Sequence, residues 1–275
     1  MTNSPFLVIG ATGKTGSRVS DLLEAAGHSV RRGSRQSPTP FDWEDSSGWA
    51  ATMAGVSAIY VTYYPDLAYP EAPEKIQLLT ETAKAAGVER VVLLAGRGEP
   101  RAEACEDIVR NSGLGYTLIR AAWFAQNFSE GFLYDSAMDG FLALPAGDVA
   151  EPFVDLDDVA EVVVAALTDP AHAGQVYDLT GPRLLTFTEV AAELGAAMGR
   201  PLVYQPITSE QFHEGLTALG DPVLADVFTE VCRQIFDGRN AKLGGAIESV
   251  LGRPARDFAD YCAQAAAAGA WEKVA

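Results

Sequence analysis

Cysteine and histidine are both scarce in this sequence, with three of each among 275 residues. They are Cys105, Cys232 and Cys262, and His28, His172 and His213. None stands in the close pairs that a zinc site requires, and so few cysteines cannot build a disulfide framework. A chain of this length buries roughly three quarters of its unfolded surface, so its fold needs neither a zinc site nor disulfides for stability. We therefore expect a reduced, cytoplasmic protein without a metal centre.

Long apolar runs and positive charge are also lacking. The longest apolar stretches, such as residues 162–167, are far shorter than the roughly twenty residues of a membrane-spanning helix. The N-terminus has no basic and apolar regions like those of a signal peptide. The formal net charge of −17 repels phosphate backbones and acidic membrane surfaces. We expect a soluble protein that acts on a small molecule, with neither nucleic acid nor a membrane as partner, and we leave a homodimer open.

The first half of the chain alternates short β-branched runs with segments of helical spacing. Each run is bounded by glycine or another turn residue, a pattern typical of repeated βαβ units on a parallel sheet. The predicted strands are residues 6–9, 29–32, 39–41, 58–62, 90–94 and 116–120. The predicted helices between them are residues 15–26, 49–53, 74–86 and 103–111. The fold class is therefore α/β, with a doubly wound parallel sheet.

This alternation stops at the aromatic-rich stretch 123–141 and resumes after it. Residues 151–169 predict a short strand and a helix with acidic residues at its start, and residues 175–181 predict one more strand. A capping box from Thr186 to Glu189 and a stop at Gly199 bound a further helix, and the remainder is predicted to be helical. The chain thus divides into a sheet domain, 1–121 with 152–181, and a small, mainly helical lobe, 122–151 with 182–275.

A glycine-rich turn lies between the first predicted strand and the first predicted helix. Gly10, Gly13 and Gly16 form G-x-x-G-x-x-G in the strand-to-helix context that makes such a pattern informative. The first glycine permits a tight turn, the second lets the backbone approach a pyrophosphate, and the third allows close packing of the helix. The alternative is an ordinary turn. We predict a Rossmann-type sheet that binds a dinucleotide.

The residues after the second predicted strand indicate which dinucleotide. In NAD-binding folds an acidic residue about 20 positions past the glycines holds the ribose 2′-hydroxyl, but here that region holds Ser34 and Arg35. A hydroxyl followed by a guanidinium suits a 2′-phosphate, so we prefer NADP(H) to NAD(H). The alternative is that Arg35, with Arg31 and Arg32, is a solvated surface charge. Asp42 could accept from the adenine amino group or cap the turn that follows it.

Several short segments resemble those of a known family. They are "GATGKTG", "FDWED", "YYPDL", "LLAGRGEP", "WFAQNF", "PFVDLDDVA" and "VYDLTGP", in this order along the chain. The sequence resembles the NmrA-like, atypical short-chain dehydrogenase/reductase family, and within it the bacterial relatives of the ergot alkaloid agroclavine and festuclavine dehydrogenases. The resemblance implies NADP(H) bound across the carboxyl ends of the strands. It places Gly10, Thr12, Gly13, Lys14, Thr15 and Gly16 at the phosphates, Arg35 near the 2′-phosphate, and Asp42 with Trp43 near the adenine.

The carboxyl ends of the strands predict the rest of the site, because ligands of open parallel sheets bind there. This rule places Thr62, Tyr63, Ala95 and Gly96 beside the cofactor. A largely aromatic pocket for a flat or cationic organic substrate follows from the neighbouring residues. They are Tyr64, Arg97, Trp123, Phe124, Asn127 and Phe128, with Gln126 close by. The alternative for the three rings of the 123–128 segment is that they fill a hydrophobic seam under the lobe.

The catalytic tetrad of typical short-chain dehydrogenases is absent, because no Tyr-x-x-x-Lys spacing occurs and Ala95 stands where many relatives carry serine. Hydride transfer to an iminium needs no general acid. For an enone or carbonyl, Tyr63 or Tyr64 is the candidate acid, and Asp66 is a remoter one whose expected role is to cap a turn. We predict an NADPH-dependent reductase of an imine, iminium, activated alkene or quinone. The alternative is a catalytically silent NADP(H) sensor acting through a protein partner.

Overall fold

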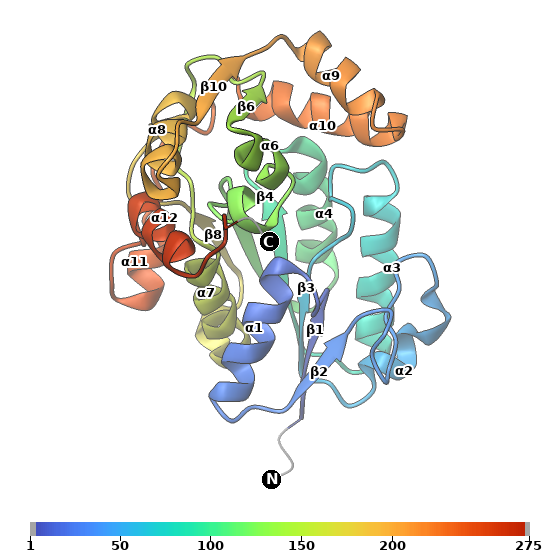
Figure 1. The fold of residues 1–275 in the computed structure, drawn as a ribbon. Helices are drawn as coiled ribbons and strands as arrows, with labels where there is room; N and C mark the ends of the chain where they lie inside the picture. Colours follow the sequence, from blue (N-terminus) through green and yellow to red (C-terminus); the bar gives the residue numbers. More distant parts are fainter. Residues whose placement is uncertain (1–3, 273–275) are drawn as a thin grey trace. The chain divides into compact units, whose positions relative to one another are not determined.

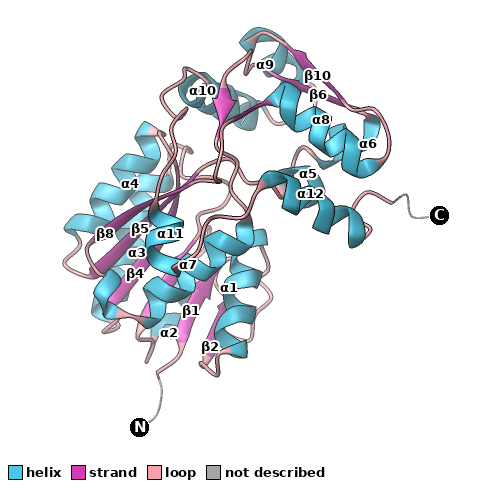
Figure 2. Ribbon diagram, turned by 90° about the vertical axis from the view of Figure 1, so that its left-hand side faces the viewer, coloured by secondary structure: helices cyan, strands magenta, loops and turns pink. Residues whose placement is uncertain are grey.

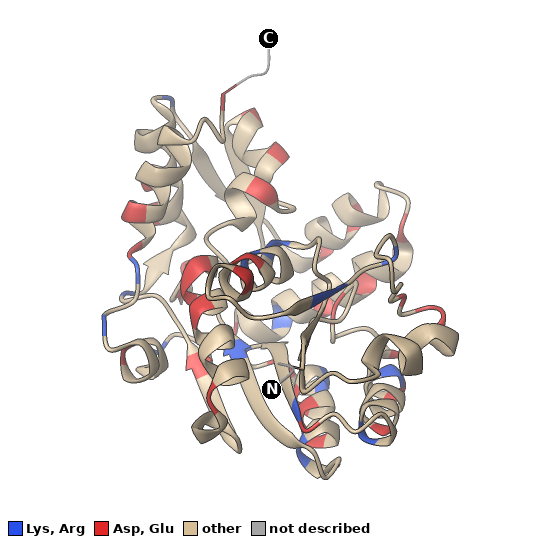
Figure 3. Cartoon of the chain, turned by 90° about the horizontal axis from the view of Figure 1, so that it is seen from below, with Lys and Arg blue, Asp and Glu red and all other residues tan. Residues whose placement is uncertain are grey.

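The computed structural model describes residues 4–272, which form two compact units, each assembled from separate stretches of the chain. The first unit contains Met1–Ala121, Leu156–Leu179 and Ala246–Gly252. The second contains Ala122–Asp155, Thr180–Gly245 and Arg253–Ala275. Acidic residues recur along the helices, in keeping with the net charge of −17 (Figure 3). No helix within residues 4–272 is both long and apolar enough to cross a membrane.

A six-stranded parallel sheet is the centre of the first unit (Figure 1). Its strands are β1 (Phe6–Ile9), β2 (Val30–Gly33), β3 (Ala58–Val61), β4 (Arg90–Gly96), β5 (Gly115–Ala121) and β8 (Gln175–Leu179). The strand order is β2-β1-β3-β4-β5-β8. The chain adds β2 on one side of β1 and then crosses to add β3 on the other side, with all strands parallel. All residues of β1 and β3 are buried, as central parallel strands require. The predicted α/β, Rossmann-type fold is confirmed.

Helices cover both faces of this sheet (Figure 2). On one face, α1 (Lys14–Ala25) packs against α7 (Leu156–Thr168), and α11 (Ala246–Leu251) contacts α7. On the other, α3 (Ala72–Ala85) packs between α2 (Trp49–Met53) and α4 (Pro100–Asn111). Two short 3-10 helices, Ser46–Gly48 and Pro170–His172, complete the unit. The helices α3 and α4 begin earlier than predicted because a proline within the first turn starts each of them.

The strand predicted at residues 39–41 is wrong, because this segment is a loop that folds back onto the end of β2. The backbone N–H of Phe41 donates to Ser34 O at 3.0 Å, and the Phe41 ring stacks on Trp49 with centroids 5.0 Å apart. Pro38 and Pro40 have no N–H to donate to a neighbouring strand. The segment is therefore held by aromatic packing instead of a ladder of backbone hydrogen bonds.

The second unit is mainly helical. Its helices are α5 (Asn127–Glu130), α6 (Tyr134–Asp139), α8 (Phe187–Met198), α9 (Ser209–Thr217), α10 (Pro222–Ile235) and α12 (Phe258–Ala267). Its strands are β6 (Phe141–Leu144), β7 (Ala150–Glu151), β9 (Leu185–Thr186) and β10 (Val203–Pro206). The prediction of a wholly helical C-terminal remainder is wrong at β10, because this segment pairs with the distant β6.

The ends of α8 confirm the predicted capping box. The hydroxyl of Thr186 accepts from the N–H of Glu189 at 3.3 Å, and the Glu189 carboxylate accepts from the N–H of Thr186 at 2.8 Å. Gly199 ends the helix with φ +65°, a left-handed conformation that suits glycine. The core of this unit is a cluster of buried aromatic side chains around Phe128, Phe153 and Phe187.

Candidate active site

The glycine turn between β1 and α1 is built so that side chains are excluded from it. Gly10 has φ +75°, and a Cβ there would lie 2.2 Å from Thr62 Oγ1. A Cβ on Gly16 would lie 2.2 Å from Gly10 O, so α1 packs directly on the turn. The N–H groups of Gly10 and Ala11 both donate to Gly33 O, which fixes the turn against β2. The result is a backbone cradle at the carboxyl end of β1.

This cradle opens at the N-terminus of α1, where an anion is favoured. Gly13 is the N-cap residue, its backbone is extended, and no side chain caps the helix. Thr12 and Gly13 are exposed, whereas Thr15 is buried. The predicted phosphate residues thus lie together at one turn, and a pyrophosphate fits it. Thr15 and the buried Gly16 can contribute only through the backbone.

The three arginines near the end of β2 have different environments. The guanidinium of Arg31 donates to Thr52 O at 2.6 Å and to Ala54 O at 2.8 Å. Arg32 forms ion pairs with Asp21 and Glu24 on α1. Arg35 is exposed and makes no hydrogen bond or ion pair within residues 4–272. Arg31 and Arg32 therefore have structural partners, and Arg35 is the guanidinium available to a ligand.

The expected adenine residues belong to a tightly packed loop. Trp43 is buried, its Nε1–H donates to Thr62 O at 3.2 Å, and its ring lies 4.7 Å from that of Tyr63. Lys75 Nζ donates to Trp43 O at 2.7 Å. Asp42 accepts from the N–H of Glu44 at 3.1 Å, so it fills the turn-capping role. Trp43 thus supports the end of β3 from within the core.

Two adjacent tyrosines after β3 differ in exposure. Tyr63 is buried, and its hydroxyl has no hydrogen-bond partner within the described part of the chain. Burial raises the pKa of Tyr63 to about 12, with a smaller contribution from Glu71. Tyr64 is 71% exposed. Thr62 donates to Ile9 O at 3.1 Å and ties this loop to β1. Of the two candidate acids, Tyr64 is the one whose hydroxyl can meet a ligand without rearrangement.

The end of β4 differs from the expectation in one respect. Ala95 and Gly96 lie at the carboxyl end of this strand, as predicted. Arg97, predicted to contact substrate, is only 5% exposed, and its Nε lies 3.7 Å from Asp178 Oδ2 on β8. The backbone N–H of Arg97 donates to Ala121 O at 3.2 Å. The guanidinium is thus buried near Asp178 of β8, which favours a structural role for Arg97 over substrate contact.

The carboxyl group of Glu99, just after β4, is a feature that the sequence reasoning missed. Glu99 is the N-cap residue of α4, but its side chain does not cap the helix. It turns toward Gly96, where a Cβ would lie 1.9 Å from Glu99 Oε1. Burial raises the pKa of Glu99 to about 8, and the nearby Asp66 adds to the shift. The available signal was an acidic residue directly before the proline that starts α4, at the carboxyl end of a strand.

The predicted substrate residues of the 123–128 segment lie in the second unit. Phe128 is fully buried in its core, and its carbonyl accepts from Trp271 Nε1–H at 2.8 Å. The burial of Phe128 thus favours the seam-filling alternative over substrate contact. Trp123 is half-buried and stacks on Phe236, and its buried Nε1–H has no hydrogen-bond partner among the described residues. Trp123 is thus partly exposed, and substrate contact by its ring remains a prediction.

The remaining two residues of this set belong to the loop and helix that follow Trp123. Phe124 is half-buried and forms an isolated β-bridge with Val154. Asn127 is buried at the start of α5, and the preceding Gln126 donates to Asp155 Oδ1 at 2.9 Å. These polar side chains hold the 123–128 segment in place within its unit.

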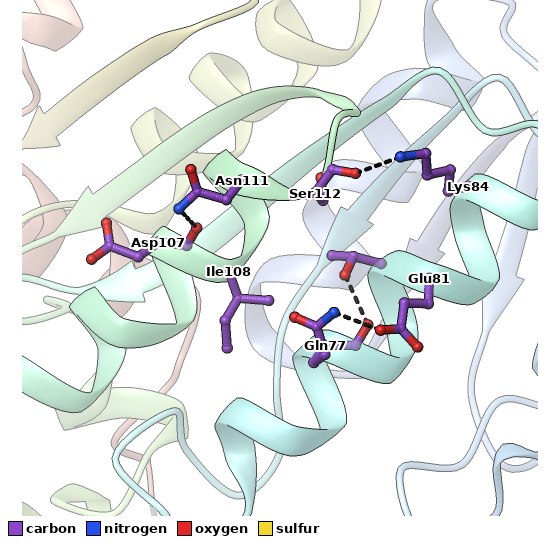
Figure 4. A pocket seen from close by; sticks show the side chains of 8 residues that line it. Gln77, Glu81, Lys84, Asp107, Ile108, Asn111 and Ser112 are labelled. Carbon is purple, nitrogen blue, oxygen red and sulfur yellow. Dashed lines mark hydrogen bonds between the residues drawn. The ribbon is translucent and has the colours of Figure 1, made fainter.

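A groove of about 450 Å³ lies between α3 and α4 (Figure 4). Its polar side chains bond to their own surroundings: Gln77 donates to Glu81, and Lys84 Nζ donates to Ser112 O at 3.1 Å. It lies toward the C-terminal ends of both helices, which run antiparallel to the strands, and so away from the carboxyl edge of the sheet. We assign this groove no part in the chemistry.

Comparison with known proteins agrees with this geometry. The family model "NAD(P)H-binding" matches residues 10–170, and the model "NmrA-like family" matches residues 103–256. The NAD(P)H azoreductase of Xenophilus azovorans is 32% identical over 96% of this chain and 99% of its own. Agroclavine dehydrogenase of Claviceps fusiformis is 28% identical over 93% of this chain and 95% of its own.

A solved structure shares the fold. The crystal structure of the Citrobacter sp. triphenylmethane reductase complexed with NADP(H) superposes with a TM-score of 0.74. It is 20% identical, and the match covers 95% of this chain and 99% of that chain. The resemblance drawn from the sequence motifs is thereby confirmed at the level of the family. The chain belongs to the NmrA-like family of NAD(P)H-binding proteins and is an NAD(P)H-dependent oxidoreductase.

Proposed function

We propose that this protein is an NADPH-dependent reductase that transfers hydride to a small conjugated acceptor: an imine or iminium, an activated alkene or a quinone. The observation that carries this proposal is the glycine cradle at the carboxyl end of β1, where a Cβ on either Gly10 or Gly16 would clash. Bound there, the cofactor supplies the hydride. The protein supplies the orientation of both reactants and the exclusion of water.

The preference for NADPH over NADH rests on Arg35. Its guanidinium is exposed and without a partner in residues 4–272, and Ser34 precedes it. A guanidinium can form paired, charge-assisted hydrogen bonds with the oxygens of a 2′-phosphate. Arg31 and Arg32 cannot replace it because each is engaged elsewhere. No carboxylate occupies the Ser34–Arg35 position to bind a free 2′-hydroxyl.

The acceptor classes follow from what the site lacks and from what the relatives reduce. Ala95 provides no hydroxyl to polarise a carbonyl, so acceptors already activated by conjugation or positive charge are favoured. An azoreductase and a triphenylmethane reductase are among the similar proteins, and both names denote extended conjugated acceptors. The half-buried Trp123 offers an aromatic surface to such a molecule.

A binding and turnover series tests this function. Purified protein is titrated with NADPH, NADP+ and NADH, and the loss of reduced-nicotinamide absorbance is then followed with cyclic imines, enones, quinones, an azo dye and a triarylmethyl dye. We expect tighter binding of NADPH than of NADH and oxidation of NADPH by at least one class. Tight binding with every acceptor silent would overturn the reductase, and absence of binding would overturn the cofactor assignment too.

A further inference from the structure

Glu99 places a carboxyl group in an unusual setting at the carboxyl edge of the sheet. It is only 8% exposed, and its Oε2 is buried with no hydrogen-bond partner among the described residues. Oε1 lies against the backbone of Gly96, and the N–H groups at the start of α4 receive no bond from the side chain. A buried carboxylate without hydrogen bonds is costly, so the group is better accommodated with its proton on.

Asp66 is the second carboxyl group of this region and lies in the loop after β3. Its Oδ1 accepts from the N–H of Ala68 at 2.8 Å, and the residue is partly exposed. Its charge acts on Glu99 and helps to raise the pKa of Glu99 to about 8, while burial raises the pKa of Asp66 itself. Because burial and the charge of Asp66 both disfavour its ionised form, the Glu99 carboxyl group keeps its proton near neutral pH.

Other titratable and charged side chains lie on α4 and on the loop of Asp66. Burial raises the pKa of the Cys105 thiol on α4 to about 12, and the charge of Asp66 adds to the shift. Arg101 donates to Ala68 O. Glu106 accepts from the guanidinium of Arg120 at 2.6 Å. Burial raises the pKa of Tyr63, on the same loop as Asp66, to about 12. Cys105 and Tyr63 thus ionise well above the pH range in which Glu99 titrates.

We propose that Asp66 and Glu99 form a proton-holding pair that delivers one proton, through the more exposed Asp66, to acceptors whose reduction requires it. This rests on the proposed reductase function. When bound, the nicotinamide cofactor would supply a hydride that adds to one atom of the acceptor double bond, and the electron pair of that bond would move to the other atom. A carboxyl O–H bond of the pair breaks, its proton bonds to that second atom, and the pair then recovers a proton from water.

The pair separates two classes of acceptor by their chemistry. A neutral azo or enone bond needs a hydride and a proton, so its reduction would use the pair. A triarylmethyl cation needs only the hydride, because its positive charge is cancelled when the C–H bond forms. The same protein would then reduce both classes of acceptor. The rate would depend on the protonation of the pair with the neutral azo or enone acceptor but not with the triarylmethyl cation. In this proposal Glu99 stores the proton and acts through Asp66, and Asp66 transfers the proton to the acceptor.

The decisive experiment compares the two acceptors in Glu99→Gln, which keeps the shape and removes the titrating proton. With a neutral azobenzene dye we expect kcat to fall by roughly 10²-fold, the usual size of a general-acid contribution. With crystal violet, a triarylmethyl cation, we expect a change of less than about twofold. The wild-type rate with the azo dye should decline above pH 8, and this decline should vanish in the variant. Glu103→Gln, on an exposed residue of the same helix, is the matched control and should behave as wild type.

A second readout does not depend on turnover. The folded-state pKa of Glu99 is raised, so its contribution to stability is present below the unfolded pKa of about 4.3 and is lost as pH rises through about 8. Gln at this position has nothing to ionise. The Tm of Glu99→Gln minus that of wild type should therefore increase from pH 5 to pH 8 and level off above, whereas the difference for Glu103→Gln should stay flat.

The outcomes distinguish the proposed Asp66–Glu99 pair from the proposed reductase function. A wild-type protein that reduces neither dye nor any other acceptor overturns the reductase function and with it the delivery step, while the Tm series still decides whether the pair holds a proton. An active wild type whose variant loses both dyes equally, or whose Tm difference is independent of pH, overturns the pair alone. Asp66→Asn should reproduce the selective loss with the azo dye, and a failure to do so counts against delivery through Asp66.

Discussion

Single residues at the end of β2 show how neighbours of one chemical type acquire different roles. Arg31, Arg32 and Arg35 are equivalent in sequence, and only their surroundings distinguish them. Arg31 donates to the carbonyls of Thr52, in α2, and of Ala54, the C-cap residue of that helix. Arg32 reaches α1. The proposed selectivity for NADPH therefore rests on Arg35, which alone among these three arginines has no hydrogen-bond or ion-pair partner within residues 4–272.

Replacing Arg35 tests this assignment. Arg35→Ala should weaken NADPH binding by roughly 10- to 100-fold, because a charge-assisted hydrogen bond contributes about 1.5–3 kcal/mol. NADH binding should change little, since NADH has no 2′-phosphate. Both affinities can be measured by nicotinamide fluorescence. Arg32→Ala is the control, and a parallel loss of NADPH selectivity there would contradict the assignment.

Gly10 offers a second test at this scale. Gly10→Ala forces a side chain into a left-handed backbone, 2.2 Å from Thr62 Oγ1. We expect a loss of about 2–4 kcal/mol in the free energy of unfolding and of most NADPH affinity. Gly55 also has a positive φ, but a Cβ there meets nothing within 4 Å. Gly55→Ala should therefore cost only about 1 kcal/mol and leave NADPH binding intact. Equal effects of the two substitutions in denaturant unfolding and NADPH titration would refute this view of the cradle.

At the scale of elements, prediction from sequence succeeded where the signal was local. The turn of Gly10, Gly13 and Gly16 and the capping box of Thr186 lie within a few residues of the structure that they specify. It failed where a partner comes from elsewhere in the chain. The segment β10 is a strand because the distant β6 pairs with it, and Glu99 acquires its properties from Asp66 and Gly96. A periodicity argument contains no information on such partners.

A charged network that joins two helical elements of the second unit can be tested directly. Arg183 forms bidentate pairs with Glu193 on α8 and with Asp257, the N-cap of α12, all at 2.7 Å. Arg183→Gln should lower the free energy of unfolding by about 1–2 kcal/mol, a value reduced for the partial exposure of all three groups. Arg233, exposed and paired with Glu230 along one helix, is the control. In urea unfolding, Arg233→Gln should change stability by less than about 0.5 kcal/mol, and a larger effect there than at Arg183 would contradict the network.

At the scale of the whole molecule, neither unit is a continuous piece of chain. The strand β8, which pairs with β5, and the helix α7, which covers α1, come from Leu156–Leu179. A fragment that ends at Ala121 leaves the edge of β5 unpaired and the apolar side of α1 uncovered. We expect this fragment to show no cooperative thermal transition by circular dichroism, in contrast to the intact chain. A sharp transition in the fragment would show that the first segment carries a sufficient core alone.

The two units alternate along the chain, and this arrangement limits how the gene can evolve by recombination. Because the second unit is made of Ala122–Asp155, Thr180–Gly245 and Arg253–Ala275, no single recombination event in the gene could exchange it for another while leaving the first unit whole. We therefore expect new acceptor preferences in such a lineage to arise by replacement of individual side chains and not by exchange of the whole second unit. Laboratory evolution of this protein should accordingly yield altered acceptors from scattered point substitutions, and chimaeras joined at one crossover should fail to fold.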